Sequence, residues 1–588
     1  MSDARPSGGP ATRATRASSD KSAVVATLVC AVVLVVLARG DAWTADDAFI
    51  AFRYLDNLLG GRGLVYNTGE RVEGFSSLLF LVLLAPARAA GVSPVVAANA
   101  LGVACSLFEL WLLVRVVRRS TSLVWAPAFA GVLFATDRIV SVWATGGLET
   151  AMHGMLVFAA FSISIDRARC PVVGRAAMLH VLLAASRPEG LAFYPLHLAL
   201  LVRAGWHDGS WRASLRRSLN VFLPGVAVLA AARYAYYGSI VANPYRAKVE
   251  GVPGTWAFGA GYVQAFAHRM GWLGGAHVLA WAVLVAAAIW AWRSRSKRNT
   301  SDAPDAPDAR TALEPLFAAI AYVAVGIAVI VPMGGDYMSD FRFLRPVMGL
   351  IAFAVAFSVA LVVGGARGVE PSADLVTRRR LGAAGIVVAL ALLVSHALRQ
   401  REGSPIFWDV TPARDHKRSL ELTEDEARRF KIALFQFAEA GDSLLSDKSG
   451  YMGYGHTLRT IDATGLLSKD IDGDFYLRPE WSEGGPRERF PGHARWPKVE
   501  FMQRERLTVI FPKISKRSPN EAEIGPRSPR RHREYPFLHV TVPLANGEFL
   551  RFFTTLTAEQ LAARATRRKI TVCWRSALGS LACAGPKP

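Results

Sequence analysis

Long apolar runs recur along this chain and are separated by short polar segments. A run of about twenty residues crosses the hydrocarbon core of a bilayer as a helix, because the core is about 30 Å thick and each residue adds ~1.5 Å. The pattern therefore predicts an α-helical polytopic membrane protein with roughly eleven transmembrane helices. The expected spans cover residues 23–40, 93–117, 122–136, 150–165, 172–186, 191–204, 218–237, 272–292, 313–332, 346–364 and 381–398.

One apolar segment, Leu78–Ala85, is too short to be counted among these spans. A segment of this length is typical of a re-entrant or interfacial helix. We therefore predict that residues 41–92 form a first outer loop with interfacial helices. Residues 1–22 are rich in Arg, Ser, Gly and Pro and predict a disordered cytoplasmic leader, and the first apolar run predicts a retained signal anchor.

Basic residues in the short loops set the expected orientation. Arg115, Arg118 and Arg119 close the second span, and Arg378–Arg380 precede the last one. Such residues concentrate in cytoplasmic loops. With Leu78–Ala85 outside the bilayer, all basic loops fall on one side, so the N-terminus is expected in the cytoplasm. Counting that segment as a span would place every basic loop outside.

The pattern changes after His396, where the chain becomes polar. Residues 23–398 are thus the predicted transmembrane domain, and residues 399–588 follow on the extracytoplasmic side by parity. This second region is long enough to bury a core. It predicts a small α/β domain with an amphipathic helix at Ala427–Ala440 and strands at Leu507–Phe511, Phe537–Val542, Glu548–Phe553 and Ile570–Trp574.

Composition and charge agree with this organisation. The chain has 588 residues, of which 52% are hydrophobic, more than a soluble chain of several domains would carry. The net charge of +21 is compatible with nucleic-acid binding, but most basic residues lie in the short loops, so we expect no nucleic-acid partner. Cys573 and Cys583 lie in the final polar region and would be able to pair in an oxidising compartment.

Two adjacent carboxylates, Asp46 and Asp47, follow directly after the first span. Ionisable groups at a membrane face are costly to desolvate and for this reason usually mark a functional site. A structural alternative stays open, in which Thr44 and Asp47 form a capping box at the start of an interfacial helix. The two interpretations are compatible.

Other polar motifs gather in the expected outer loops. A phosphate-bearing lipid would present its headgroup at this depth, where Arg and Lys bind phosphate and a carboxylate serves as base or metal ligand. Local ion pairs, turns and solvated loop charges are the alternatives. The candidates are Arg53 and Glu73 in the first loop, followed by Asp137, Arg138, Glu149, Arg187, Glu189, Arg246, Lys248, Asp336, Arg342 and Arg345.

The string from Asp46 to Tyr54, followed by Asn67 and the run Gly69–Gly74, resembles the first outer loop of the GT-C glycosyltransferases. More narrowly, it is similar to the bacterial branch that contains terminal arabinofuranosyltransferases. The resemblance covers most of residues 40–470. Further motifs of that branch follow in the same order: Gly147–Thr150, Arg187–Gly190, Tyr236–Gly238 with Asn243, Gly334–Asp336 with Phe341–Phe343, and Gly453–Tyr454 with Ile461–Leu466.

The resemblance implies a multi-pass glycosyltransferase of the bacterial inner membrane. Its donor is a polyprenyl-phosphate sugar, with arabinofuranose as one candidate, and its acceptor is a cell-envelope glycan or glycolipid. A first-loop acid, here Asp46, is implied as the catalytic base. It is aided by an acid of the second outer loop, for which Glu149 is the first candidate and Asp137 the second. Many relatives have Asp in that loop. Some relatives use a divalent cation and others do not, so a cation on Asp46 or Asp47 stays an open alternative.

From the residues we expect Asp46 to take the proton of the acceptor hydroxyl in an inverting transfer. Arg246, Lys248, Arg342 and Arg345 are the expected ligands of the donor phosphate. In the final domain, Trp481, Trp496 and Tyr535 are candidates for stacking on sugars or for core packing. Two other classes stay open: a transporter or flippase for a lipid-linked glycan, and a non-catalytic envelope assembly factor.

Overall fold

The structure, a computed structural model, describes residues 10–166, 172–270, 313–336, 338, 340–362, 428–477, 494–515, 537–544, 546–576 and 580–586. The chain divides into two compact units. The first, called the helical unit, contains residues 1–42, 95–229 and 256–412. The second, called the mixed unit, contains residues 43–94, 230–255 and 413–588. The first outer loop therefore belongs to the same unit as the C-terminal region.

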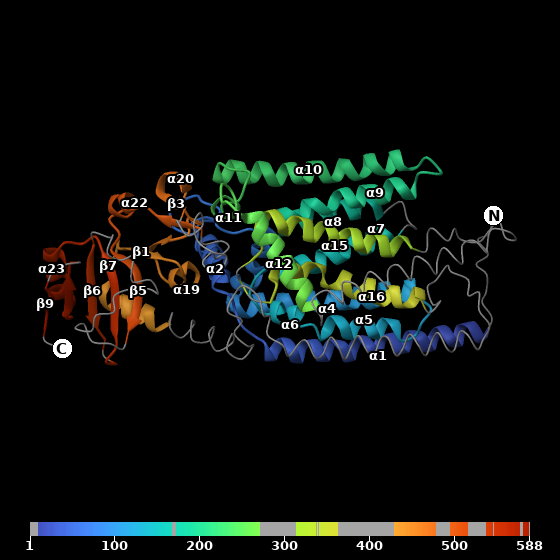
Figure 1. Cartoon of the computed structure of the whole chain (residues 1–588), viewed down its shortest axis with the longest axis horizontal. Helices are drawn as coiled ribbons and strands as arrows, with labels where there is room; N and C mark the ends of the chain where they lie inside the picture. The colour runs from blue at the N-terminus through green and yellow to red at the C-terminus, as the bar shows by residue number, and fades with distance from the viewer. Residues whose placement is uncertain are drawn as a thin grey trace. The chain divides into compact units, whose positions relative to one another are not determined.

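The long helices of the helical unit run roughly parallel or antiparallel to one another, and α12 is inclined to them (Figure 1). α10 ends inside the mixed unit. The elements are α1 (Pro10–Gly40), α4 (Pro94–Ser120), α5 (Ala126–Ala135), α6 (Arg138–Ala144), α7 (Thr150–Ile165), α8 (Val172–Ser186), η1 (Pro188–Phe193), α9 (Tyr194–Ala204), α10 (Trp211–Tyr237), α12 (Thr255–Met270), α15 (Glu314–Met333), η2 (Arg342–Val347) and α16 (Met348–Val362).

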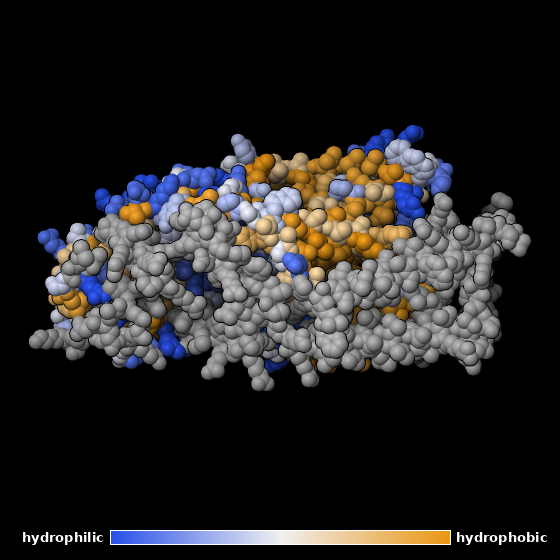
Figure 2. Space-filling view, viewed as in Figure 1, coloured by the Kyte–Doolittle hydropathy of each residue, from blue (hydrophilic) through white to orange (hydrophobic). Residues whose placement is uncertain are grey.

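Five stretches among the described residues are helical, long and apolar enough to cross a membrane. The surface of α1 carries exposed apolar side chains such as Val25, Leu28 and Val32. Figure 2 shows hydrophobic residues gathered on the visible face of the helices. Exposed apolar surface of this extent suits lipid rather than water. The five stretches are Ala23–Gly40, Pro94–Ser120, Trp211–Tyr237, Glu314–Met333 and Arg342–Leu361.

The prediction of a helical membrane protein is therefore confirmed, whereas the count of eleven spans stays a prediction. The expected spans at 122–136, 150–165 and 172–186 coincide with the shorter apolar helices α5, α7 and α8. The expected spans at 272–292 and 381–398, and the charged loops beside them, lie outside the described residues.

Helix α3 (Leu78–Ala89) corresponds to the short apolar segment of the first outer loop. Its 12 residues extend about 18 Å at ~1.5 Å per residue, less than the thickness of the hydrocarbon core. Phe80, Leu81 and Leu84 are buried, while Val82 and Leu83 are exposed. A helix of this length and amphipathic character agrees with the interfacial interpretation.

The mixed unit contains a seven-stranded sheet with the order β2-β1-β5-β7-β6-β8-β9. β1 pairs in parallel with β2 and β5, and the remaining pairs are antiparallel. A two-stranded sheet, β3-β4, lies in the same unit. The strands are β1 (Ser443–Ser446), β2 (Arg459–Asp462), β3 (Phe475–Leu477), β4 (Arg495–Pro497), β5 (Val509–Ser515), β6 (Leu538–Pro543), β7 (Phe549–Thr554), β8 (Val572–Arg575) and β9 (Ala582–Ala584).

Two helices pack on the sheet through a shared apolar core. One is helical at residues 428–437, and the other is α23 (Ala558–Arg568). Phe430, Leu434 and Phe437 of the first contact the same cluster as Val540 of β6 and Leu561 of α23. The four strands expected from sequence correspond to β5, β6, β7 and β8, and the expected amphipathic helix corresponds to residues 428–437.

Short helices complete the mixed unit: α2 (Asp46–Leu59), α11 (Asn243–Lys248), α19 (Ser449–Gly453), α20 (Ile471–Asp474) and α22 (Val499–Arg504). Arg53 of α2 is buried and donates to the carbonyl oxygens of Tyr66 (2.8 Å) and Leu458 (2.8 Å). This contact ties the first outer loop to the chain just before β2. The predicted domain boundary near residue 399 lies outside the described residues and stays a prediction.

Cys573 and Cys583 form a disulfide between β8 and β9, where the two residues are directly paired in the antiparallel register. Such bonds persist in oxidising compartments. The pairing therefore supports the expected extracytoplasmic location of this region, which stays a prediction. Trp496 stacks on Phe511 with ring centroids 4.8 Å apart, which is a packing role, whereas Trp481 and Tyr535 lie outside the described residues.

Candidate functional site

The acid pair of the first outer loop forms the first turn of α2. The residue before the helix is Ala45, which is in an extended conformation and makes no side-chain capping hydrogen bond. The capping-box alternative therefore gains no support from the hydrogen bonds. Acids in the first turn are nevertheless favoured by the helix dipole. Asp46 and Asp47 thus lie together at the start of a well-formed helix.

Asp46 is held by the backbone of α19. Its Oδ1 accepts the N–H of Tyr451 at 2.7 Å, and its Oδ2 accepts the N–H of Gly450 at 3.1 Å. Loss of hydration raises the pKa of Asp46 to about 7, a shift that the two N–H groups oppose and the charge of Asp47 increases. A carboxylate in this state changes its protonation near neutral pH.

A lysine and a third acid lie close to this pair. The Nζ of Lys248, at the end of α11, is 3.8 Å from Asp47 Oδ2. Lys248 also attracts Asp462, whose pKa is raised mainly by burial. Asp462 accepts hydrogen bonds from Ser449 Oγ at 2.9 Å and from the backbone N–H of Leu466 at 3.0 Å. We call Asp46, Asp47, Lys248 and Asp462 the acid site.

The position of Lys248 follows from the anchoring of its helix. Asn243, the first residue of α11, donates its side-chain amide to the carbonyl oxygens of Leu466 and Ser468, each at 2.8 Å. The backbone N–H of Asn243 donates to the carbonyl oxygen of Glu73 at 3.0 Å. Three separate segments of the mixed unit therefore meet at the acid site.

A metal ion is not favoured by these donors. In the part of the chain that the structure describes, no group of three or more His, Cys, Asp or Glu side chains is arranged to hold one. Both oxygens of Asp46 already accept backbone N–H groups, and Asp47 is close to a lysine. Hard cations need several oxygen ligands. The reaction proposed below is written with the side chains of the chain alone.

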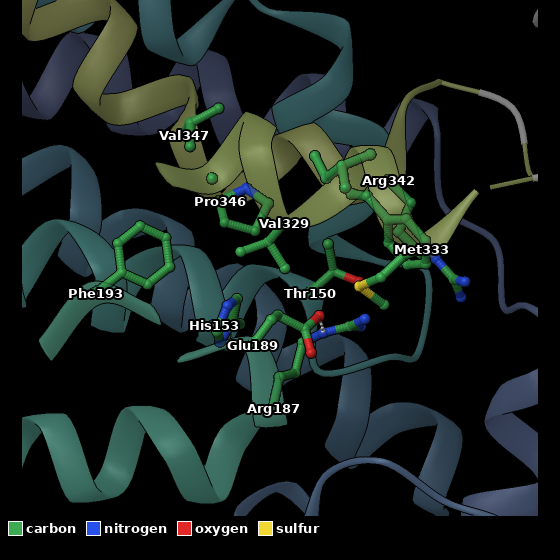
Figure 3. Close-up of a pocket in the computed structure, with 13 residues that line it drawn as sticks. Thr150, His153, Arg187, Glu189, Phe193, Val329, Met333, Arg342, Pro346 and Val347 are labelled. Atoms are coloured by element: carbon green, nitrogen blue, oxygen red, sulfur yellow. Dashed lines mark hydrogen bonds and ion pairs between the residues drawn. The ribbon is translucent and has the colours of Figure 1, made fainter. Parts of the chain in front are cut away.

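A second group of charges lies in the helical unit, around Arg187. Arg187 precedes η1, and its Nη1 is 2.7 Å from the carboxylate of Glu149, the residue before α7. It also forms an ion pair with Glu189, and this pair is drawn in Figure 3. Burial alone would raise the pKa of Glu189, but the charge of Arg187 lowers it below the ordinary value. Glu189 is thus held as an anion.

Arg342 lies beside this group at the start of η2. Its Nε is 2.6 Å from Asp336 Oδ2. Two guanidinium groups contact the ring of Phe343, whose centroid is 5.1 Å from Arg187 Cζ and 4.9 Å from Arg342 Cζ. Such cation–π contacts stabilise the arginines where water is scarce.

The turn before Arg342 is held from the second outer loop. Asp340 and Phe341 both have positive φ, of 56° and 47°, which is uncommon for residues other than glycine. Arg138 Nε is 2.9 Å from Asp340 Oδ1, and Trp143 Nε1 donates to the Asp340 carbonyl oxygen at 2.8 Å. These contacts fix the backbone that presents Arg342.

A small open pocket lies at these residues (Figure 3). Its polar lining consists of Thr150, His153, Arg187, Glu189 and Arg342. Its apolar lining comes mainly from α15 and the elements beside it, including Phe193, Val329, Ile330, Met333 and Val347. A pocket that is apolar on one side and carries arginines on the other suits an amphiphile. We call it the arginine pocket.

The remaining candidates have structural partners. Arg345 is fully buried, with Nη1 2.9 Å from Glu109 Oε2 and Nη2 donating to Ser106 Oγ at 3.1 Å, so we do not retain it as a phosphate ligand. Glu73 pairs with Arg233 at 2.8 Å. Arg246 is half-exposed and lies 3.5 Å from Glu250.

Sequence reasoning missed several partners. Glu109 is an isolated acid within the apolar run of α4, a signal that was available in the sequence. Gly450 and Tyr451 carried no comparable signal, because their backbone makes the contact. Of the candidate residues, Asp46 belongs to the mixed unit, whereas Glu149 and Arg342 belong to the helical unit.

No family model matches the sequence. Two structures of ArnT from Cupriavidus metallidurans align with this chain at 12% identity. The structure bound to undecaprenyl phosphate has a TM-score of 0.45 and covers 84% of this chain and 92% of that chain. The apo structure has a TM-score of 0.43 and covers 76% and 87%, respectively.

Among curated proteins, the chain is similar to the terminal beta-(1->2)-arabinofuranosyltransferase of Mycobacterium tuberculosis, with 28% identity over 348 residues. The match covers 53% of this chain and 52% of the relative, so the chain spans about half the length of the curated relative that it matches. This match confirms the predicted resemblance of the chain to the terminal arabinofuranosyltransferases.

Proposed function

We propose that this chain is an integral membrane glycosyltransferase. It transfers a sugar from a polyprenyl-phosphate donor to a hydroxyl of an envelope glycan or glycolipid, on the outer face of the inner membrane. The observation that carries the proposal is the acid site, where Asp46 has a pKa of about 7 and is oriented at the start of α2. The name of the curated relative favours arabinofuranose as the sugar.

Asp46 acts as the general base. As the acceptor hydroxyl attacks the anomeric carbon of the donor, its proton moves to a carboxylate oxygen of Asp46. The new glycosidic C–O bond forms while the bond between the anomeric carbon and the phosphate oxygen breaks. The polyprenyl phosphate leaves with the electron pair of that bond. A single displacement of this kind inverts the anomeric centre.

The arginine pocket binds the donor in this proposal. Its apolar residues Val329, Ile330 and Met333 contact the first part of the prenyl chain, and Arg342 binds the phosphate. Arg342 pairs with Asp336 through Nε, and the guanidinium fork of five N–H donors matches the geometry of a phosphate. Glu149 and Glu189 hold Arg187 in place beside the same pocket.

Polar groups buried among the helices bear on the transporter alternative. Arg345 and Glu109 pair with each other, and His197 shares a hydrogen bond of 2.9 Å with Ser164. Each contact joins two different elements of the helical unit. Such bonds hold membrane helices together. These groups therefore give the transporter alternative no specific support.

The test is sugar transfer by the purified protein in detergent, with polyprenyl-phosphate-linked arabinofuranose and an arabinofuranose oligosaccharide. Asp46→Asn keeps the shape of the side chain and removes the base, so transfer should fall by roughly 10²–10⁴-fold. Asp56→Asn, on the same helix, is the matched control because Asp56 contacts Arg88 and Tyr454. Wild-type transfer by Asp46→Asn would rule out its role as base.

A further inference from the structure

We propose that α19 is a positioning clamp for Asp46, in which the backbone N–H groups of Gly450 and Tyr451 orient its carboxylate for proton transfer. This inference rests on the proposed function. It makes a segment of the C-terminal region a part of the catalytic machinery, although that segment contributes no side chain to the reaction.

The geometry constrains the carboxylate at both ends. The Tyr451 N–H binds Oδ1 at 2.7 Å, and the Gly450 N–H binds Oδ2 at 3.1 Å. One donor on each oxygen fixes the plane of the group. Each carboxylate oxygen has about two lone-pair sites, so each keeps one for an incoming proton. The clamp therefore orients the base without occupying all of its acceptor sites.

Two glycines allow the clamp to approach α2. A Cβ atom on Gly450 would lie 1.8 Å from the backbone oxygen of Asp46 and 2.9 Å from its Cγ. A Cβ atom on Gly453 would lie 1.7 Å from the hydroxyl oxygen of Tyr66. Neither distance is compatible with a side chain. The close backbone contact is thus a specific requirement of this place in the fold.

Further contacts hold the clamp against the first outer loop. The Tyr66 hydroxyl donates to the Ser449 carbonyl oxygen at 2.6 Å, and the Tyr451 hydroxyl donates to the Thr44 carbonyl oxygen at 3.0 Å. The Tyr451 ring lies 4.2 Å from that of Phe49, between centroids. These bonds anchor α19 on both sides of Asp46, independently of the carboxylate itself.

A purely structural role is the alternative, in which Asp46 only fastens α19 to α2. The two roles differ in the protonation of Asp46. A donor to the ionised carboxylate stabilises that form, so loss of the donor raises the pKa of the acid. A positioning clamp therefore affects the pH profile of transfer, whereas a fastening contact changes only the amount of folded protein.

The experiment compares Tyr451→Pro with Tyr451→Ala. Both variants lose the ring and the hydroxyl, but only proline lacks the backbone N–H, and helical φ suits proline at this early position of α19. We expect the acid limb of kcat/KM in Tyr451→Pro to lie higher than in Tyr451→Ala by on the order of one pH unit. The KM for the polyprenyl-phosphate donor should be equal in the two variants.

A second variant keeps the test decisive if proline prevents folding. The α-hydroxy analogue of tyrosine, incorporated at position 451, replaces the N–H by oxygen and retains the side chain. It should shift the acid limb in the same direction. If the folded proteins with and without this N–H have the same pH profile of transfer, the proposed clamp is overturned, even if wild-type transfer is normal. Absence of transfer by the wild-type protein would instead overturn the proposed function.

Discussion

The acid site and the arginine pocket hold their carboxylates in different ways. In the acid site, Asp46 is bound by neutral backbone N–H groups and its pKa is raised to about 7. In the arginine pocket, Glu189 is bound by a guanidinium and its pKa is lowered. The first environment permits a proton to come and go near neutral pH, and the second fixes a negative charge. The difference separates a group suited to chemistry from groups suited to architecture.

The largest expected effect comes from breaking the fixed charges. Arg187→Gln leaves the buried carboxylates of Glu149 and Glu189 without their cation, so the free energy of unfolding should fall by about 3–5 kcal/mol. Thermal unfolding in detergent measures this. Arg246→Gln is the control, because Arg246 is half-exposed and its ion pair contributes little. Equal unfolding temperatures for the two variants would contradict the architectural role of Arg187.

The pH dependence of transfer tests the other half of the comparison. Asp46 must be ionised to act as base, so kcat/KM should fall tenfold for each pH unit below about 7 and level off above it. The measurement is the pH profile of transfer in detergent. The control is Asp56→Asn, whose pH profile should have the same shape as that of the wild type. A profile that stays flat between pH 5 and 8 would contradict Asp46 as the titrating group.

The two sites should also affect stability in opposite directions. The pKa of Asp46 is higher in the folded protein than in the unfolded chain. Its contribution to the free energy of unfolding is therefore present below the pKa of the unfolded state and is lost as the pH rises to about 7. The folded pKa of Glu189 is depressed, so its contribution is present above the unfolded pKa and is lost as the pH falls through the folded one. The measurement is the unfolding temperature of Asp46→Asn, Glu189→Gln and the wild type as a function of pH. Relative to the wild type, the two variants should show opposite pH dependences.

Donor binding should respond to Arg342 by a moderate amount. Arg342→Gln removes the charge-assisted bonds to the phosphate, so the KM for the polyprenyl-phosphate donor should rise by roughly 10–100-fold, with a smaller change in kcat. Lys248→Gln serves as the comparison, because its charge lies beside Asp47 in the acid site. An unchanged donor KM in Arg342→Gln would remove the arginine pocket from the donor-binding site.

The smallest effect is expected for Asp47→Asn. Asp47 lies in the first turn of α2 near Lys248 and does not act as the base, so transfer should fall by only about fivefold, equivalent to ~1 kcal/mol. Initial rates beside those of Asp46→Asn measure the difference. A loss for Asp47→Asn as large as that for Asp46→Asn would assign the proton transfer to the pair rather than to one acid.

Local pattern was enough to predict much of this molecule. The apolar runs predicted helices such as α4 and α15, because a membrane span depends on length and hydropathy alone. Alternating residues predicted β6 and β7, whose inward-facing side chains form the sheet core. The short strands β1 and β2 were missed, since four residues give too little periodicity. The first-loop acids were found because charge at a membrane face is rare.

Contacts between residues that are far apart in the sequence could not be predicted from local pattern. Asp46 and Tyr451 are 405 residues apart, and their contact uses a backbone N–H that every residue except proline carries. Arg345 was expected at a phosphate, but it pairs with Glu109, 236 residues earlier. Residue type indicates that a charge needs a partner, while only the fold determines which partner is present.

The side chain of Asn67 covers the edge of the sheet. β2 is the outermost strand, and its Thr460 exchanges hydrogen bonds with the Asn67 amide: the backbone N–H donates to Oδ1 at 3.0 Å, and Nδ2 donates to the carbonyl oxygen at 2.9 Å. The side-chain amide thereby imitates the peptide group of a neighbouring strand. At the opposite border, the disulfide fastens the short strand β9. Exposed strand borders recruit other chains and promote aggregation. A fragment that begins at residue 413 lacks Asn67, so the backbone groups at the edge of β2 are exposed. Such a fragment will favour self-association over a soluble monomer.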